Sequence, residues 1–200
     1  MTTHHNVSRR GVLLTGVSGF ALATAGPNDV LAQQELSPTP ACEDGGAPTV
    51  RQTEGPYFKP RSPERSDLRE AGMRGQPVEV SGFVLARNCR PIARALIDFW
   101  QADSEGEYDN QGFRLRGHQF TDAEGRYRLR TVMPGAYPGR TRHIHVKVQP
   151  PGGRLLTTQL YFPGEANNRS DGLFRRELLM RVAKAEGSLA ARFDFVLDLL

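Results

Sequence analysis

Cysteine is scarce in this sequence of 200 residues, which contains two, Cys42 and Cys89. Neither belongs to a Cys-x-x-Cys pair or lies beside a cluster of histidines, so zinc sites built from cysteine are not indicated. In an oxidising compartment such a pair can form a disulfide, which here would tie an N-terminal arm to the domain that follows. Sequence separation does not reveal whether the two sulfur atoms meet, and both states stay open at this point.

Long hydrophobic runs are also lacking. The apolar run over residues 11–25 has 15 residues, fewer than the roughly 20 that a membrane-spanning helix needs. It follows the pair Arg9-Arg10, a twin-arginine export pattern, and the Val-Leu-Ala of residues 30–32 fits a signal-cleavage site, with residues 23–25 as the alternative. We expect residues 1–32 to be a twin-arginine signal peptide rather than a disordered basic tail. The expected location is periplasmic or secreted, with no stable membrane association after cleavage.

Excess charge of one sign is small. Loss of residues 1–32 removes two arginines and one aspartate, which leaves 24 basic and 21 acidic residues and a net charge of +3. Because the arginines are spread along the chain, the sequence does not indicate a nucleic-acid-binding surface. The length suits one domain of ordinary size with a single core.

Short alternating segments separated by turns dominate the chain after residue 77. They cover residues 78–85, 95–102, 120–121, 126–132, 143–148, 154–162 and 193–197. We expect an all-β fold, a β-sandwich of short, mostly antiparallel strands with irregular loops over residues 77–200. Helical spacing of apolar residues over 171–184 predicts one short helix near the C-terminus. Residues 33–76 lack periodicity and are expected to form an extended arm and a pocket-lining loop.

The segment His143-Ile144-His145-Val146 reads as part of a strand with two histidines on one face. Ile144 and Val146 would then face the core on the other side. Two imidazoles on one rigid strand supply half of a first-row transition-metal site, since imidazole suits iron, copper, zinc and nickel alike. A structural interpretation competes, in which the histidines are polar residues on the outer face of a half-buried strand.

The remaining ligands are less obvious. The histidine strand and its two neighbours carry no acidic residue close to the pair, which weakens a site of two histidines and one carboxylate, although Asp98 and Asp103 remain possible donors. Tyrosine is the other hard oxygen ligand, because a cation can ionise a phenol whose ordinary pKa is near 10. Tyr108 lies in a polar loop and Tyr137 in the turn before the histidine strand. A copper or zinc site on the two histidines is a further alternative.

Five short motifs stand in a fixed order around the histidines. They are Trp100-Gln101-Ala102 with Gly106-Glu107-Tyr108, Asp122-Ala123-Glu124-Gly125-Arg126-Tyr127, Pro134-Gly135-Ala136-Tyr137-Pro138, Arg140-Thr141-Arg142-His143-Ile144-His145, and Thr158-Gln159-Leu160-Tyr161-Phe162. The ordered set, over roughly residues 53–197, resembles the intradiol ring-cleavage dioxygenases, which are non-haem ferric enzymes that open catechols between the two hydroxyls. In its short chain and its early β domain it is similar to protocatechuate 3,4-dioxygenase-like, exported single-domain members.

The resemblance implies that Tyr108, Tyr137, His143 and His145 hold non-haem Fe(III). It further implies that the substrate displaces Tyr137, which helps to take up the protons of the catechol. The implied partners are a catechol-type substrate and O2, and the implied product is a cis,cis-muconate-type diacid. Members of the family often form homo-oligomers, although no interface is legible in this sequence.

Other site residues also follow from the resemblance. Gly55, Pro56 and Tyr57 match the segment that lines the substrate pocket. Arg140 would stabilise negative charge that develops on the ring, and Gln159 would donate a hydrogen bond near the iron or the O2 site. Thr141 and Arg142 stand where many members carry proline and a small residue, so Arg142 competes with Arg140 for the electrostatic role.

One alternative has no chemistry. Transthyretin-like or collagen-binding-B-like sandwich modules share the general form of residues 80–137. Such binding modules need neither the His-x-His strand, nor the Gly-x-Tyr loop, nor an arginine three residues before the first histidine. The presence of all three favours the enzyme.

Overall fold

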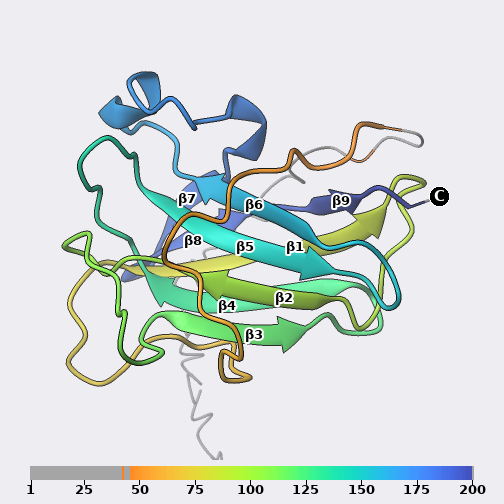
Figure 1. Cartoon of the computed structure of the whole chain (residues 1–200), viewed down its shortest axis with the longest axis horizontal. Helices are drawn as coiled ribbons and strands as arrows, with labels where there is room; N and C mark the ends of the chain where they lie inside the picture. Colours follow the sequence, from red (N-terminus) through yellow and green to blue (C-terminus); the bar gives the residue numbers. More distant parts are fainter. Residues whose placement is uncertain (1–41, 43–45, 200) are drawn as a thin grey trace, which may run out of the picture. The chain divides into compact units, whose positions relative to one another are not determined.

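The computed structural model describes residue 42 and residues 46–199, and the fold is a sandwich of two β-sheets (Figure 1). The predicted signal peptide, residues 1–32, lies outside the described residues, as does most of residues 33–45. The strands among the described residues are β1 (Pro77–Ala86), β2 (Leu96–Trp100), β3 (Arg116–Phe120), β4 (Arg126–Val132), β5 (His143–Gln149), β6 (Leu156–Tyr161), β7 (Arg181–Ala185), β8 (Ser188–Arg192) and β9 (Phe195–Leu197). The predicted all-β sandwich is confirmed. Among the described residues no helix is long and apolar enough to span a bilayer.

The first sheet is entirely antiparallel and has the strand order β3-β2-β5-β6. Its inner face buries alternate residues, because successive side chains of a strand point to opposite sides. Ile97 and Phe99 of β2 and Ile144 and Val146 of β5 are all fully buried in the core. The histidines of β5 therefore point to the opposite face, as the alternation predicted.

The second sheet has the order β4-β1-β8-β7, with β9 pairing to β1 as well. The pairs β1–β4 and β7–β8 are antiparallel, whereas β8 and β9 each run parallel to β1. Val78, Val80 and Val84 of β1 pack with Leu129 of β4 against the inner face of the first sheet. This packing makes the first sheet a rigid platform for the side chains on its outer face.

The helix predicted over residues 171–184 is wrong. The structure has a short 3-10 turn, η2 (Arg176–Leu178), and then strand β7. The apolar residues lie in three separate places and do not form one helical stripe. The Phe174 ring packs on Tyr161 with centroids 5.2 Å apart, Leu178 is buried at η2, and Val182 belongs to β7. A second 3-10 turn, η1 (Ala166–Arg169), precedes this segment.

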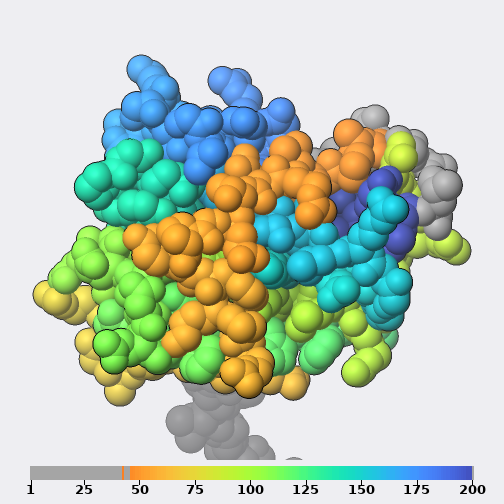
Figure 2. Space-filling model, viewed as in Figure 1, coloured from red at the N-terminus to blue at the C-terminus, as the bar shows by residue number. Residues whose placement is uncertain are grey.

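The described arm runs along the outer edge of the sandwich and then over the first sheet (Figure 2). Its backbone is held at Thr49 by the carbonyl of Val196 (2.8 Å) and at Gln52 by the carbonyl of Thr157 (2.8 Å). Cys42 and Cys89 form a disulfide, with their Cα atoms 5.7 Å apart. The bond ties the start of the arm to the turn after β1, so the disulfide that the sequence left open is present.

Candidate metal centre

The two histidines of β5 converge on one point of the outer face. Their Nε2 atoms lie 3.0 Å apart, and both side chains are buried. The His143 Nδ1–H donates to the carbonyl of Thr141 at 2.7 Å, and this bond leaves the Nε2 lone pair free for a cation. Burial and then the charge of Arg140 lower the pKa of His143 to about 4. Burial and then His143 lower the pKa of His145 as well, so both rings are neutral, the form that binds metals, at neutral pH.

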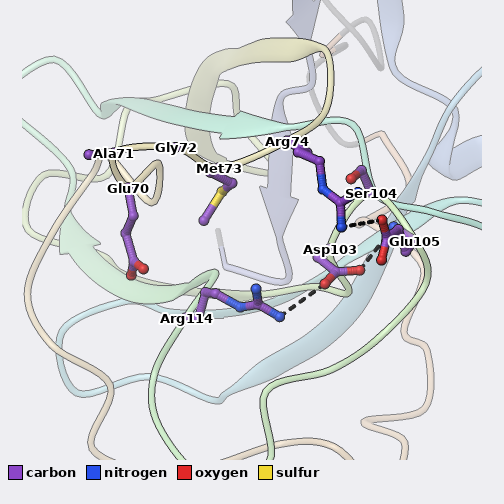
Figure 3. A pocket seen from close by; sticks show the side chains of 9 residues that line it. All are labelled: Glu70, Ala71, Gly72, Met73, Arg74, Asp103, Ser104, Glu105 and Arg114. Carbon is purple, nitrogen blue, oxygen red and sulfur yellow. Dashed lines mark hydrogen bonds and ion pairs between the residues drawn. The ribbon is translucent and has the colours of Figure 1, made fainter.

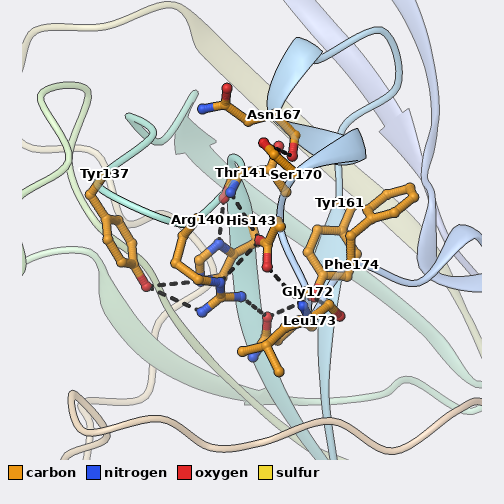
Figure 4. A network of polar contacts seen from close by, with 12 residues as sticks. Tyr137, Arg140, Thr141, His143, Tyr161, Asn167, Ser170, Gly172, Leu173 and Phe174 are labelled. Carbon is orange, nitrogen blue, oxygen red and sulfur yellow. Dashed lines mark hydrogen bonds and ion pairs between the residues drawn. The ribbon is translucent and has the colours of Figure 1, made fainter.

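Tyr137 approaches the histidines from the loop between β4 and β5. Its Oη lies 3.4 Å from His143 Nε2 and accepts a hydrogen bond from Arg140 Nη1 at 3.3 Å (Figure 4). A tight turn fixes this position, because the Arg140 N–H donates to the Tyr137 carbonyl at 2.9 Å. Burial raises the pKa of Tyr137, and the Arg140 charge opposes that effect. The phenol is therefore neutral until a cation draws off its proton.

Tyr108 comes from the loop between β2 and β3. Its ring centroid lies 6.0 Å from that of Tyr137 and 6.2 Å from that of His145. The hydroxyl is buried and makes no hydrogen bond of normal geometry with a described residue, a state that normally costs free energy. Burial raises the pKa of Tyr108 above its ordinary value. The Tyr137 hydroxyl is close enough to raise the pKa of Tyr108 further. An orphaned phenol beside two neutral imidazoles and a second phenol fits a hard trivalent cation such as Fe(III).

The two aspartates considered as ligands take no part in the site. Asp98 Oδ1 accepts from Ser62 Oγ at 2.8 Å, and Asp103 Oδ1 accepts from the backbone N–H of Glu105 (2.9 Å) and of Glu107 (3.1 Å). Within the described part of the chain no three His, Cys, Asp or Glu side chains are grouped to hold a metal. Among the described residues, the side chains that converge are therefore imidazoles and phenols, and neither aspartate joins them.

Arg140 is the arginine that faces the site. Its Nε donates to Asp171 Oδ2 at 3.0 Å, and its Nη2 donates to Gln159 Oε1 at 2.5 Å. Burial alone would raise the pKa of Asp171, but the N–H groups of Thr141 and Leu173 and the Arg140 guanidinium outweigh it and lower that pKa. An ionised Asp171 therefore holds Arg140 next to the Tyr137 hydroxyl.

Arg142 is held away from the site. Its Nε donates to Glu165 Oε2 at 3.1 Å and its Nη1 to the carbonyl of Pro134 at 2.7 Å. Because both ends of its guanidinium are bonded to residues outside the cluster of ligands, the contacts separate the two arginines that the sequence left in competition. They favour Arg140 for the electrostatic role.

Gln159 of β6 links three parts of the site. Its Nε2 donates to the carbonyl of Thr53 at 2.9 Å, while its Oε1 accepts from Arg140 and from the hydroxyl of Tyr161 at 2.9 Å. Burial raises the pKa of Tyr161 to about 12, so this hydroxyl stays a donor. The amide thus connects the arm to the Arg140 guanidinium, an arrangement that favours a positioning role over direct contact with O2.

The predicted pocket-lining loop lies against the ligands at two of its three residues. Gly55 has a positive φ of 70°, and a Cβ added there would lie 3.4 Å from Cε1 of His145. The ring of Tyr57 stacks on that of Tyr108, with centroids 4.2 Å apart and planes inclined by 13°. Pro56 between them is exposed. The loop therefore reaches both His145 and Tyr108 from the arm.

Two glycines let the loops of the two tyrosines touch. A Cβ on Gly135 would lie 2.3 Å from the backbone nitrogen of Gly106, and one on Gly106 would lie 2.8 Å from the carbonyl oxygen of Ala136. Gly106 also has a φ of 92°, which side-chain-bearing residues rarely adopt. The glycines of the two tyrosine motifs thus set how closely Tyr108 and Tyr137 approach each other.

Gly135→Ala is expected to push these two loops apart. The added methyl group collides with backbone, which cannot move aside as a flexible side chain would, so we expect a loss of about 1–3 kcal/mol in the free energy of unfolding. The displaced phenols should also weaken iron binding. Thermal unfolding and iron content check the result against Gly172→Ala, whose Cβ meets nothing within 4 Å and whose backbone does not have a positive φ. Equal iron content in both variants would contradict the expected displacement.

Sequence reasoning missed three residues of the site. Asp171 anchors Arg140, Trp100 stacks on the His145 ring at 4.8 Å and 10°, and Arg116 is buried beneath the Tyr108 loop. Trp100 belongs to a motif quoted above, but its contact depends on the register that pairs it with His145. Asp171 gives no local signal, because its partner lies 31 residues away.

Comparison with known proteins decides the family. A protein-family model described as "Dioxygenase" matches residues 53–199, which is most of the chain and includes all the site residues named above. The chain belongs to the intradiol ring-cleavage dioxygenase family. Its members are oxidoreductases, and membership argues against a sandwich module that only binds.

Individual relatives of this intradiol dioxygenase agree. The 6-chlorohydroxyquinol 1,2-dioxygenase of Cupriavidus pinatubonensis is 29% identical over 215 residues, which cover 94% of this chain and 73% of the relative. The protocatechuate 3,4-dioxygenase beta chain of Burkholderia cepacia is 35% identical over 119 residues, 50% of this chain and 51% of the relative. This chain thus spans between about half and three quarters of the length of these curated relatives.

A solved structure extends the agreement to three dimensions. The dioxygenase domain of a dioxygenase and carbohydrate-binding protein fusion from Streptomyces sp. SirexAA-E is 56% identical, with a TM-score of 0.76, and the match covers 77% of this chain and 100% of that one. The fold of this chain is therefore the fold of the dioxygenase domain of that fusion protein.

Proposed function

We propose that this chain is a non-haem Fe(III) dioxygenase that cleaves a catechol-type ring between its two hydroxyls. The reaction adds both atoms of O2 to the substrate while one ring carbon–carbon bond breaks, and it yields a cis,cis-muconate-type diacid with no external reductant. The observation that carries the proposal is the convergence of two neutral imidazoles and two phenols, one with an orphaned hydroxyl, beside the Arg140 guanidinium.

Tyr108, Tyr137, His143 and His145 would hold the iron. Bound ferric iron would withdraw electron density from a chelated catechol and make its ring reactive toward O2. Once ionised by the cation, the Tyr137 Oη would be suited to take up a proton from the substrate, and the Arg140 guanidinium that donates to it would hold the phenolate in place until then. Arg140 itself, fixed by Asp171 and Gln159, would stabilise negative charge on the ring without reorganising.

Pocket shape would come from the loop of residues 53–58. Gly55 keeps the backbone close to His145, since an added Cβ would touch Cε1 of the ring at 3.4 Å and the φ of +70° favours glycine. Tyr57 covers the Tyr108 ring and shields it from solvent. These side chains would orient a flat aromatic substrate and limit the access of water to the reacting ring.

Turnover of catechols by iron-loaded protein tests the proposal. The mature chain is incubated in air with catechol, protocatechuate and hydroxyquinol, and muconate absorbance and O2 uptake are followed together. We expect a coloured protein, because phenolate-to-iron charge transfer absorbs visible light, and one O2 consumed per ring opened. A colourless iron-loaded protein without O2 uptake on any of the three would refute the proposed function.

We further propose that the protein works outside the cytoplasm after twin-arginine export. The disulfide between Cys42 and Cys89 supports this location, because such bonds persist in oxidising compartments. Fractionation of cells that produce the full chain tests it, with Arg9→Lys combined with Arg10→Lys as the export-defective control. Accumulation of mature protein in the cytoplasm of cells with the unaltered signal would contradict it.

A further inference from the structure

Arg116 of β3 is a buried arginine that the proposed reaction has not used. Its side chain is only 1% exposed and points to the face that carries the metal centre. Register places it in one row across the sheet, since Arg116 pairs with Trp100, Trp100 with His145, and His145 with Gln159. A permanent charge in this position needs partners, because an uncompensated buried charge is strongly unfavourable.

The partners of Arg116 are backbone carbonyls. Its Nε and Nη2 donate to the carbonyl of Asp109 at 3.2 and 3.0 Å, and its Nη1 donates to the carbonyl of Tyr57 at 2.6 Å. No carboxylate forms an ion pair with it in the described ranges. The planar guanidinium therefore spans two segments that are 52 residues apart in sequence, which a single ammonium group cannot do with the same geometry.

Both bonded carbonyls belong to the immediate surroundings of Tyr108. Asp109 is the next residue, and Tyr57 is the residue whose ring stacks on Tyr108 at 4.2 Å. Asp109 is itself fixed, because its Oδ1 accepts from the N–H groups of Gln111 (2.9 Å) and Gly112 (2.7 Å). Movement of either segment away from the guanidinium would open the stack on Tyr108.

We propose that Arg116 is a positioning residue that clamps the Tyr57 segment and the Tyr108 segment together as one unit. The consequence of the clamp rests on the proposed function: it keeps the loop that lines the substrate pocket and the proposed ligand Tyr108 in fixed positions relative to each other. Substrate contact with the loop of residues 55–57 is thereby transmitted to the Tyr108 phenol through the stack and the shared guanidinium. The clamp itself is a property of the metal-free chain.

Arg65 offers a matched control. It is also a partly buried arginine that donates to two backbone carbonyls, those of Arg116 (Nε, 3.0 Å) and Phe113 (Nη2). It contacts neither Tyr57 nor Asp109. Arg65→Lys therefore removes a comparable fork from the same side of the sandwich, and it meets the proposed clamp only at the backbone carbonyl of Arg116, not at the guanidinium or its two acceptors.

Hydrogen exchange of the metal-free chain tests the clamp directly. In Arg116→Lys, peptides covering residues 55–58 and 106–112 should both exchange about tenfold faster, the effect of losing one buried hydrogen bond on local opening. Arg65→Lys should leave both peptides unchanged. Arg116→Met serves as a second variant where it folds. Unchanged exchange at either peptide in Arg116→Lys would overturn the clamp.

The iron-loaded protein gives a second readout. In Arg116→Lys we expect a shifted visible charge-transfer band and a KM for catechol raised about fivefold or more, a change that simple loss of stability would not cause. A lower thermal midpoint with an unaltered band and KM would assign Arg116 a purely structural role. Should the parent chain itself lack the band, the proposed function fails, while the exchange result still judges the clamp.

A surface hollow outside the metal centre is lined by paired charges. It lies between the segment of residues 70–74 and the start of the Tyr108 loop (Figure 3). Arg74 pairs with Glu105 at 2.6 Å and Arg114 with Asp103 at 2.9 Å across it. Both arginines of this hollow are therefore already paired with carboxylates of the same hollow.

Discussion

His145→Ala is expected to abolish iron binding and ring cleavage together. The substitution removes one of the two imidazoles and leaves His143 with the two phenols, a set too small to retain the metal against water. We expect iron content to fall below about a tenth of the parent value and kcat/KM to fall by at least about a hundredfold, in line with losses of metal-site residues. Metal analysis, the visible band and O2 uptake measure the three effects on one preparation.

His118→Ala is the control for this substitution. His118 lies on the neighbouring part of the same sheet, where its Nδ1 meets Ser62 Oγ at 3.1 Å, and the site described above does not include it. The His118→Ala variant should keep its iron content and its activity within about a factor of two of the parent.

Tyr108→Phe should behave like His145→Ala, because it removes a phenol whose hydroxyl has no other partner among the described residues. Full iron and turnover in either ligand variant would refute the ligand set.

Arg140→Ala is expected to lower kcat by about a hundred- to a thousandfold while iron remains bound. Arg140 contacts no proposed ligand except the Tyr137 hydroxyl, so the metal site should stay assembled. The loss is of the size measured when one preorganised group is removed from a developing anion. Steady-state kinetics on catechol, with iron content measured in parallel, separates the effect on the chemical step from an effect on loading.

Arg142→Ala decides whether this role is assigned to the correct arginine. Its guanidinium is bonded to Glu165 and to the carbonyl of Pro134, so kcat should change less than about fivefold. A large loss in Arg142→Ala together with an unaffected Arg140→Ala would move the electrostatic role to Arg142. Asp171→Asn should follow Arg140→Ala in milder form, because the amide holds the guanidinium less firmly.

Much of the fold could be predicted from the sequence, because buried and exposed residues alternate along its strands. Strands β1, β4 and β5 lie within one or two residues of their predicted limits, since their buried faces are regular runs such as Val78, Val80 and Val84. β3 was recognised only at its end, because its buried members are Arg116 and Gly117, which no hydrophobic pattern marks. The segment after residue 171 misled the periodicity argument, since three unrelated contacts happened to fall at helical spacing.

The part of the site that could be predicted is the part whose residues lie close together in the sequence. His143 and His145 share a strand face, and their convergence follows from strand geometry alone. Tyr108 and Tyr137 were named through the resemblance, because nothing in a loop sequence states which way a phenol turns. Asp171 and Arg116 depend on contacts between distant segments, and such contacts become visible only when the sheets are assembled.

The length of β5 separates the proposed metal ligands from the hairpin that follows the strand, where another molecule could be attached. The strand begins at His143 and ends at Gln149, and the hairpin beyond it carries Gly152, which is exposed and has nothing within 4 Å of an added side chain. Seven residues of extended chain put that hairpin about 20 Å from the ligands. Coupling the protein to a solid support, or inserting a second module, at this hairpin should therefore give an immobilised catalyst that keeps the properties of the free one.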